Sequence, residues 1–296
     1  MPAYRPFLEG PFRLHMGLRA LEPAGWIERG DDLEPQLERR RALLDGRHGE
    51  VFGALPESLP GQAETLRLLL DHLLRHFPDA YADEGGHVVH RATGERFERA
   101  AFADRPLELA GRLVQEDLCL MQRGETGYRL VAAVLCFPSR WRLANKLGRP
   151  LDAIHEPVPG FDQRLAAPVG RFFSRLEPGR LVWRVNWSLV DTPELFLPPE
   201  HRARAYELAP EGAGQRLWLR IERQTLCRLP ASGDVLFTIR TYVERLAEAL
   251  DGPASAAALA ARIREMPDAM ARYKSIAPVR DSLLAWLEHR AACPGA

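Results

Sequence analysis

Apolar residues recur at helical spacing in several segments of the chain. The clearest case is residues 60–77, where Leu66, Leu69 and Phe77 fall on one face of a helix. Pro168 starts or interrupts another of these helices. The remaining segments with this spacing are 33–45, 106–116, 162–175 and, as about three short helices, 253–292. The pattern therefore predicts helices towards both ends of the chain.

The middle of the chain carries strand patterns instead. In residues 181–190, Trp183 and Trp187 point to one face, while Arg184 and Asn186 point to the other. The other predicted strands are the almost continuously apolar 128–137 and the alternating 216–226 and 234–243, with a Ser-Gly turn at 232–233 joining the last two and a hairpin around Thr93-Gly94. Several strands linked by short turns indicate an antiparallel sheet.

Helices before and after an antiparallel sheet define the α+β class. The first residues, 1–30, are rich in proline and glycine, and we expect an extended N-terminal arm there. We expect residues 31–296 to form a single domain, with a sheet core at about 86–245 and C-terminal helices at 253–292.

Charge and cysteine content narrow the classes of function. Lys plus Arg and Asp plus Glu number 40 each, so the formal net charge is zero and no global basic field favours nucleic acid or an acidic membrane. The four cysteines form no C-x-x-C pair, which excludes the spacing of a zinc ribbon or an iron–sulfur cluster. No segment has the apolar length of a signal peptide or a membrane span. We therefore expect a soluble, cytoplasmic protein. The sequence leaves its oligomeric state open, with a homo-oligomer as one option.

Common catalytic signatures are absent from the sequence. It contains no G-x-G-x-x-G, no G-x-x-x-x-G-K-[ST], no G-x-S-x-G and no H-E-x-x-H. The sequence therefore does not support a dinucleotide-binding site, a P-loop, a serine hydrolase or a zinc protease.

Two segments stand out as candidates for chemistry. His155 lies in a loop framed by prolines, within a segment (136–161) that also carries Trp141, the basic residues Arg140, Arg142 and Lys146, and a Gly-Arg-Pro turn. A stiff loop suits a histidine that must hold one orientation, although it also suits a loop that merely packs on the core.

The second candidate is a polar face of the predicted sheet. Alternation places Trp218, Arg220, Glu222 and Gln224 on one side of their strand, and the strand at 181–190 offers Arg184 and Asn186. Such a cluster lines a pocket or simply faces solvent, and the pattern does not separate the two.

Longer blocks resemble one known family. QEDLCLMQR (115–123), CFPSRWRLANKLGRPLDAIHEPVPGFD (136–162), RVNWSLV (184–190), RIERQTLCRLP (220–230), LFTIRTYV (236–243) and MARYKSI (270–276) are similar to the haem-dependent oxidative N-demethylase-like family. The resemblance runs from about Leu14 to Ala285.

The resemblance implies a PAS-like sheet that binds haem b. It implies oxidative N-demethylation of a small secondary amine such as dimethylamine, with dioxygen as co-substrate and formaldehyde and a primary amine as products. It also implies electrons from a separate reductase that carries the flavin and the iron–sulfur cluster, which agrees with the absence of cluster spacing among the cysteines of this chain.

Residue roles follow as hypotheses. We expect His155 to ligate the haem iron, with His201 and His90 as alternatives. The candidates for the haem propionates are Arg140, Arg142, Lys146 and Arg223. A methylated ammonium group needs a carboxylate, for which Glu222 comes first and Asp117 second. The candidates for further substrate contacts are Trp187, Trp218, Arg220 and Gln224. A competing hypothesis is a haem-binding sensor or carrier without turnover, since PAS-like folds serve many functions.

Overall fold

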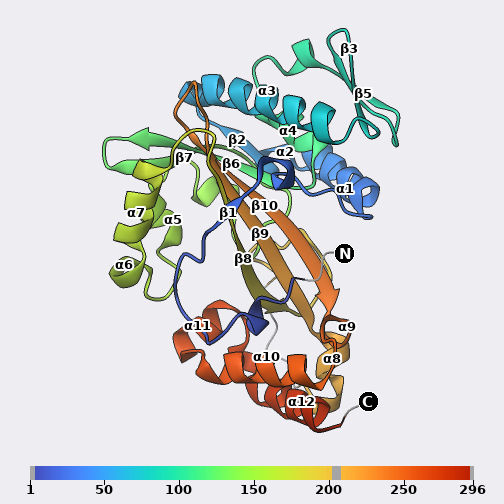
Figure 1. Ribbon diagram of the computed structural model, residues 1–296, viewed down its shortest axis with the longest axis vertical. Helices are drawn as coiled ribbons and strands as arrows, with labels where there is room; N and C mark the ends of the chain where they lie inside the picture. The colour runs from blue at the N-terminus through green and yellow to red at the C-terminus, as the bar shows by residue number, and fades with distance from the viewer. Residues whose placement is uncertain (1–3, 202–207, 294–296) are drawn as a thin grey trace.

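The computed structural model describes residues 4–201 and 208–293. The protein is α+β, with a large antiparallel sheet and several helices around it (Figure 1). The strands are β1 (Arg19–Leu21), β2 (Phe52–Ala54), β3 (Tyr81–Glu84), β4 (His87–His90), β5 (Glu95–Glu98), β6 (Asp117–Gly124), β7 (Gly127–Val134), β8 (Leu181–Val190), β9 (Trp218–Arg228) and β10 (Val235–Arg245). The helices are α1 (Leu33–Gly46), α2 (His48–Val51), α3 (Leu59–His76), α4 (Pro106–Leu113), α5 (Leu151–His155), α6 (Phe161–Arg164), α7 (Ala166–Arg175), α8 (Ala213–Arg216), α9 (Leu246–Ala249), α10 (Pro253–Glu265), α11 (Asp268–Tyr273) and α12 (Arg280–Ala292).

The large sheet has the strand order β1-β8-β9-β10-β6-β7-β2, and a small sheet has the order β3-β4-β5. The hairpin of β9 and β10 forms the centre of the large sheet and pairs along its whole length, from Trp218 with Arg245 to Arg228 with Val235. Gly233 in its turn has φ of +75°, a conformation that glycine adopts without the steric cost of a Cβ atom.

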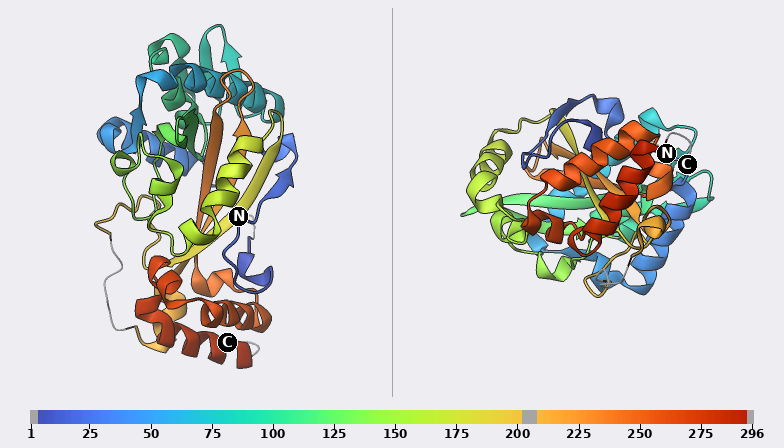
Figure 2. Two further views of the ribbon diagram at one scale, coloured as in Figure 1. Left: turned by 90° about the vertical axis from the view of Figure 1, so that its left-hand side faces the viewer. Right: turned by 90° about the horizontal axis from the view of Figure 1, so that it is seen from below.

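Helices cover the sheet on both faces and at one end (Figures 1 and 2). Leu118, Leu120 and Leu236 point to the face covered by α3 and α4. Their strand neighbours Cys119 and Val235 point to the other face, where α7 packs. Because side chains alternate along a strand, each central strand contributes to two separate cores. A third core joins β9 and β10 to the C-terminal helices α10 and α12.

The predicted α+β class and antiparallel sheet are confirmed, and so are most of the predicted elements. The helix predicted at 106–116 is shorter, because it ends at Leu113 and the chain turns into β6 at Asp117. The helix predicted at 162–175 is divided, with α6 ending at Arg164 and Pro168 in the first turn of α7. The division of the chain into an arm and a single domain stays a prediction.

Helix α3 is the longest helix of the described segments, and charged residues interrupt it. No helix in residues 4–201 and 208–293 has both the length and the apolar character needed to cross a membrane.

Candidate functional site

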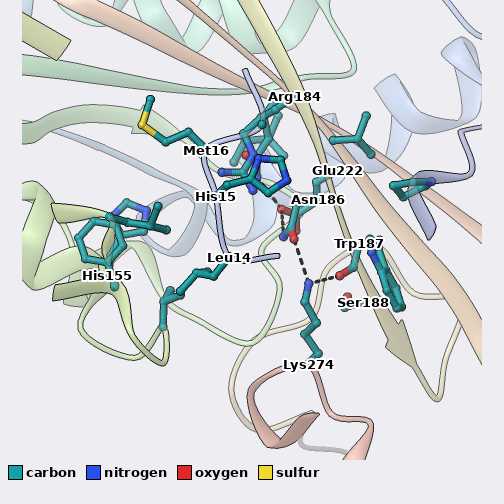
Figure 3. A pocket seen from close by; sticks show the side chains of 18 of the residues that line it. Leu14, His15, Met16, His155, Arg184, Asn186, Trp187, Ser188, Glu222 and Lys274 are labelled. Atoms are coloured by element: carbon teal, nitrogen blue, oxygen red, sulfur yellow. Dashed lines mark hydrogen bonds between the residues drawn. The ribbon is translucent and has the colours of Figure 1, made fainter. Parts of the chain in front are cut away.

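A cavity of about 1000 Å³ lies between one face of the large sheet and the helices α5–α7. Strands β8, β9 and β10 form one wall, and α5 and α7 form the wall opposite. Residues 9–19, which precede and enter β1, and the end of α11 complete the lining (Figure 3). Leu14, His15 and Met16 lie along the cavity within that N-terminal stretch.

The sheet wall of the cavity is polar. Asn186 pairs with Glu222 across β8 and β9, and Arg184 pairs with Gln224, so the four side chains point to one face. Oε2 of Glu222 accepts hydrogen bonds from Nε2 of Gln224 at 3.0 Å and from Nδ2 of Asn186 at 3.4 Å. Oε1 of Glu222 lies 3.8 Å from Nε of Arg220. These contacts fix the carboxylate at the edge of the cavity.

The opposite wall carries His155 at the end of α5. Its Nδ1 lies 2.9 Å from the main-chain oxygen of Leu151, one helical turn earlier, and its ring stacks on Phe161. A nitrogen that donates to a carbonyl is protonated, so Nε2 of the neutral ring keeps its lone pair. Within the described residues no hydrogen-bond partner contacts Nε2. Burial lowers the pKa of His155, and the charges of Lys146 and Arg184 lower it further, which favours the neutral imidazole.

Lys146 and Arg184 line the cavity, and among the described residues neither has a carboxylate within ion-pair distance. Nζ of Lys146 lies 4.0 Å from the centre of the Trp141 ring, and burial lowers the pKa of this lysine to about 8. Nε of Arg184 is buried without a hydrogen-bond partner in the described part of the chain, and burial lowers the pKa of the guanidinium. Buried charges without partners are costly, so both are suited to an anionic ligand.

Six of the residues proposed from the sequence line the cavity: Glu222, Gln224, Trp187, His155, Lys146 and Arg140. Arg140 is also occupied elsewhere, because it forms an ion pair of 3.1 Å with Asp191.

The other candidates lie outside the lining. Asp117 is fully buried at the start of β6, where it forms an ion pair of 2.7 Å with Arg40 and accepts hydrogen bonds from the main-chain nitrogens of Cys136 and Phe137. Arg142 is half exposed and pairs with Glu200. These contacts satisfy the charges of Asp117 and Arg142, so neither side chain needs a ligand.

Three candidates of β9 also have contacts of their own. Arg223 points to the opposite face of the sheet and forms an ion pair of 3.1 Å with Glu28. Arg220 is fully buried and donates to the main-chain oxygens of Leu195 and Phe137. The ring of Trp218 stacks under the guanidinium of Arg245, at 4.4 Å. Of these, Arg220 alone is linked to the cavity, through Glu222.

The alternative histidines lie away from the cavity. His90 is buried in the small sheet with its Nδ1 2.8 Å from the hydroxyl of Thr93. His201 is exposed at the surface, beyond β8. Neither belongs to the cavity lining.

Sequence reasoning missed Lys274, which follows α11 and reaches the polar wall. Its Nζ donates to Oδ1 of Asn186 at 3.0 Å and to the main-chain oxygen of Trp187 (Figure 3). Burial lowers the pKa of Lys274 to about 8. The block MARYKSI contained this lysine, but nothing in the local pattern showed that a C-terminal segment returns to β8.

The fold and this cavity define an α+β protein with a ligand site between the sheet and a helical cover, in which a neutral histidine faces a polar strand pair. The family model described as "Haem-dependent oxidative N-demethylase, alpha subunit-like" matches residues 17–284. The chain therefore belongs to that family. The family name implies haem dependence, an oxygenase-type N-demethylation and a multi-subunit enzyme, and it names neither the substrate nor the reductase.

The residues of the cavity fit a haem group. An imidazole with a free Nε2 is a common axial ligand, and its second nitrogen is held by a carbonyl, as metal-bound histidines usually are. The carboxylates of a haem need cations, and the unpaired Arg184 and Lys146 supply them. The apolar rings of Phe161, Phe172 and Phe237 contribute lining that is suited to a macrocycle.

Proposed function

We propose that this chain binds haem b in the cavity and is the subunit that oxidatively removes a methyl group from a small secondary amine of the dimethylamine type. The observation that carries the proposal is a single cavity in which Nε2 of His155 is free on the helical wall and Glu222 stands on the sheet wall. Dimethylamine, dioxygen, two electrons and two protons would give methylamine, formaldehyde and water. A separate reductase with flavin and an iron–sulfur cluster would supply the electrons.

The haem-binding roles go to residues that line the cavity. Nε2 of His155 would ligate the iron, and the Leu151 carbonyl would keep the ring in the required tautomer. Arg184 and Lys146 would pair with the propionates, with Arg140 as a third cation that already has Asp191. When bound, the haem supplies the activation of dioxygen.

Glu222 is proposed to bind the ammonium group of the substrate. Its Oε2 is occupied by the amides of Asn186 and Gln224, while Oε1 has a contact of only 3.8 Å, to Arg220. Oε1 is therefore the oxygen that remains for a ligand N–H. Trp187 also lines the cavity, but it pairs with Ile221 and turns its ring to the face opposite Asn186 and Glu222, so it supplies no aromatic wall beside this carboxylate.

The electrons are proposed to come from a partner because the cysteines lack the spacing of a cluster site and residues 4–201 and 208–293 offer no other ligand group for one. Cys119 and Cys136 are buried, Cys293 is exposed, and none of the four cysteines forms a disulfide. The described residues contain no group of three or more metal-ligating side chains.

We also propose that five strands of the large sheet form the PAS-like unit. Numbered along the chain from β6, these strands lie in the order 2-1-5-4-3, and α5–α7 lie between the second and third of them. Superposition of an experimental structure on PAS domains tests this assignment.

Absorption spectroscopy tests the proposal as a whole. Protein expressed with a haem supply should show a strong Soret band that shifts when dimethylamine is added. A band that ignores small amines would favour the haem sensor or carrier, and no band after reconstitution would contradict haem binding. The variant His155→Ala should lose stable haem binding, whereas His289→Ala, an exposed histidine of α12, should keep it.

The amine site has its own variant. Glu222→Gln keeps the size of the side chain and removes its charge. We expect the amine-induced shift to need at least about 10-fold more dimethylamine, because a charge-assisted hydrogen bond is lost. Haem content should stay at the wild-type level. An unchanged amine titration would show that Glu222 is not the partner of the cation.

A further inference from the structure

Lys274 places an ammonium group in a buried position of the cavity wall. Its side chain is about nine-tenths buried, with a relative exposure of 9%. Its Nζ has two oxygen partners, Oδ1 of Asn186 and the main-chain oxygen of Trp187, and lies 5.3 Å from the centre of the Trp187 ring. Burial of an ammonium group is costly, so these partners offset a penalty that an apolar residue would not incur.

The contact with Lys274 determines which way the Asn186 amide points. A protonated lysine has three donors and no acceptor, so the Asn186 atom that faces it must be the oxygen. The NH₂ group then points to the other side, where Nδ2 lies 3.4 Å from Oε2 of Glu222. If the amide were turned over, its oxygen would face the carboxylate, and two acceptors would repel each other.

We propose that Lys274 is a positioning residue, which orients the amide of Asn186 and through it holds the carboxylate of Glu222 with Oε1 towards the ligand. This inference rests on the proposed amine site. It extends that site to a segment that follows α11, 88 residues after Asn186 in the sequence.

The use of lysine at this position supports a geometric role. Only two of the 40 basic residues are lysines, Lys146 and Lys274, and both line the cavity. An ammonium group is a compact donor that can sit between two oxygens of neighbouring residues, whereas a guanidinium is a longer, planar fork. Lys274→Arg is therefore not expected to restore the function of the lysine.

A direct electrostatic role for Lys274 predicts the opposite effect of its removal on amine affinity. The charged and titratable groups in electrostatic contact with Lys274 are Glu222 of β9 and Arg184 of β8, and Tyr273 of α11 shares this environment. If the lysine acted only as a positive charge, its removal would make a cationic amine bind more tightly. Positioning predicts that Lys274→Met weakens amine binding by about 10-fold with haem content unchanged, which is the usual scale for loss of an outer-shell partner.

A double-mutant cycle shows whether the lysine acts through Asn186. Asn186→Leu removes the amide that connects Lys274 to Glu222. If Lys274 acts through this amide, the double variant should bind dimethylamine no more weakly than Asn186→Leu alone. Losses that multiply instead would overturn the coupling. Arg272→Met, at an exposed position of α11, is the matched control and should bind amine like the wild type.

The closing experiment does not depend on amine binding. The chain contains only two asparagines, Asn145 and Asn186, so protein labelled with [¹⁵N]asparagine gives two side-chain NH₂ signals, which Asn186→Leu assigns. Lys274→Met should shift the Asn186 signals strongly and Arg272→Met should not. Unchanged Asn186 signals in Lys274→Met overturn the positioning role. If the signals shift but wild-type protein ignores all amines, the proposed function fails and the orientation of Asn186 by Lys274 stands.

Discussion

The imidazole of His155 lies flat against the ring of Phe161, with ring centres 4.6 Å apart and planes 10° from parallel. Nδ1 of the same imidazole is tied to the Leu151 carbonyl. The hydrogen bond fixes which edge of the ring faces the helix, and the stacking fixes the tilt of its plane. Together they aim Nε2 in one direction before any ligand is present, which lowers the ordering cost of binding.

Phe161→Leu tests the importance of that stacking. Leucine keeps the site apolar and removes the flat surface, so the imidazole can tilt. We expect haem affinity to fall by about 10-fold or more, the scale found when groups that orient a metal ligand are lost. Haem titration followed in the Soret band measures this. Phe102→Leu, which lies near the small sheet and packs against Phe97, should not change the affinity. Equal affinities for all three proteins would show that stacking does not prepare the ligand.

A variant of Arg184 distinguishes a role of its charge in haem binding from a role of its packing. Arg184→Met should weaken haem binding by about 10-fold or more, because a buried guanidinium without a carboxylate partner is replaced by an apolar side chain. The same variant should bind the dimethyl ester of haem as well as the wild type does, because the ester has no propionate charge. Arg142→Met serves as a control, since Arg142 already pairs with Glu200 at the surface. An equal loss for haem and its ester would mean that Arg184 contributes packing alone.

Local patterns predicted the elements that carry the polar wall. Alternation at 181–190 and 216–226 placed Asn186 and Glu222 on polar strand faces, and the structure pairs these two residues across β8 and β9. Prolines around His155 drew attention to the other wall, although His155 ends the short helix α5 and does not lie in the predicted loop. Both signals are local, because alternation and proline depend only on neighbouring residues.

Contacts between segments that are far apart in the chain could not be predicted from the sequence. Asp117 was a candidate carboxylate because nothing local shows that Arg40, 77 residues earlier, is its partner. Lys274 was missed for the same reason, since its partner Asn186 is 88 residues away. Strand β6 was not predicted, and the helix predicted at 106–116 was three residues too long, since the chain becomes extended at Val114.

The pair of Asp117 and Arg40 leads to a prediction on stability. Both side chains are almost completely buried, at 1% and 0% exposure, and their ion pair is 2.7 Å long. Asp117→Asn leaves a buried guanidinium without a charge partner, so the free energy of unfolding should fall by about 3–5 kcal/mol. Denaturant titration measures this. Asp191→Asn, which breaks the more exposed pair with Arg140, should cost less. A loss below about 1 kcal/mol would show that Arg40 finds other compensation.

The two lysines should titrate well below the ordinary lysine pKa, because burial lowers the pKa of each to about 8. Selective [¹³Cε]lysine labelling gives two signals, which Lys274→Met assigns. Between pH 8 and about 10.5 the unfolded chain binds more protons than the folded protein, so the contribution of these groups to stability rises with pH across that window. Below pH 8 both lysines are charged in the folded and the unfolded state, and the full cost of burying the two charges applies.

Haem should raise the pKa of Lys146, whose proposed partner is a propionate, more than that of Lys274, which already has two oxygen partners. Titration of both lysines near 10.5 in the haem-free protein would show that water reaches the two amines.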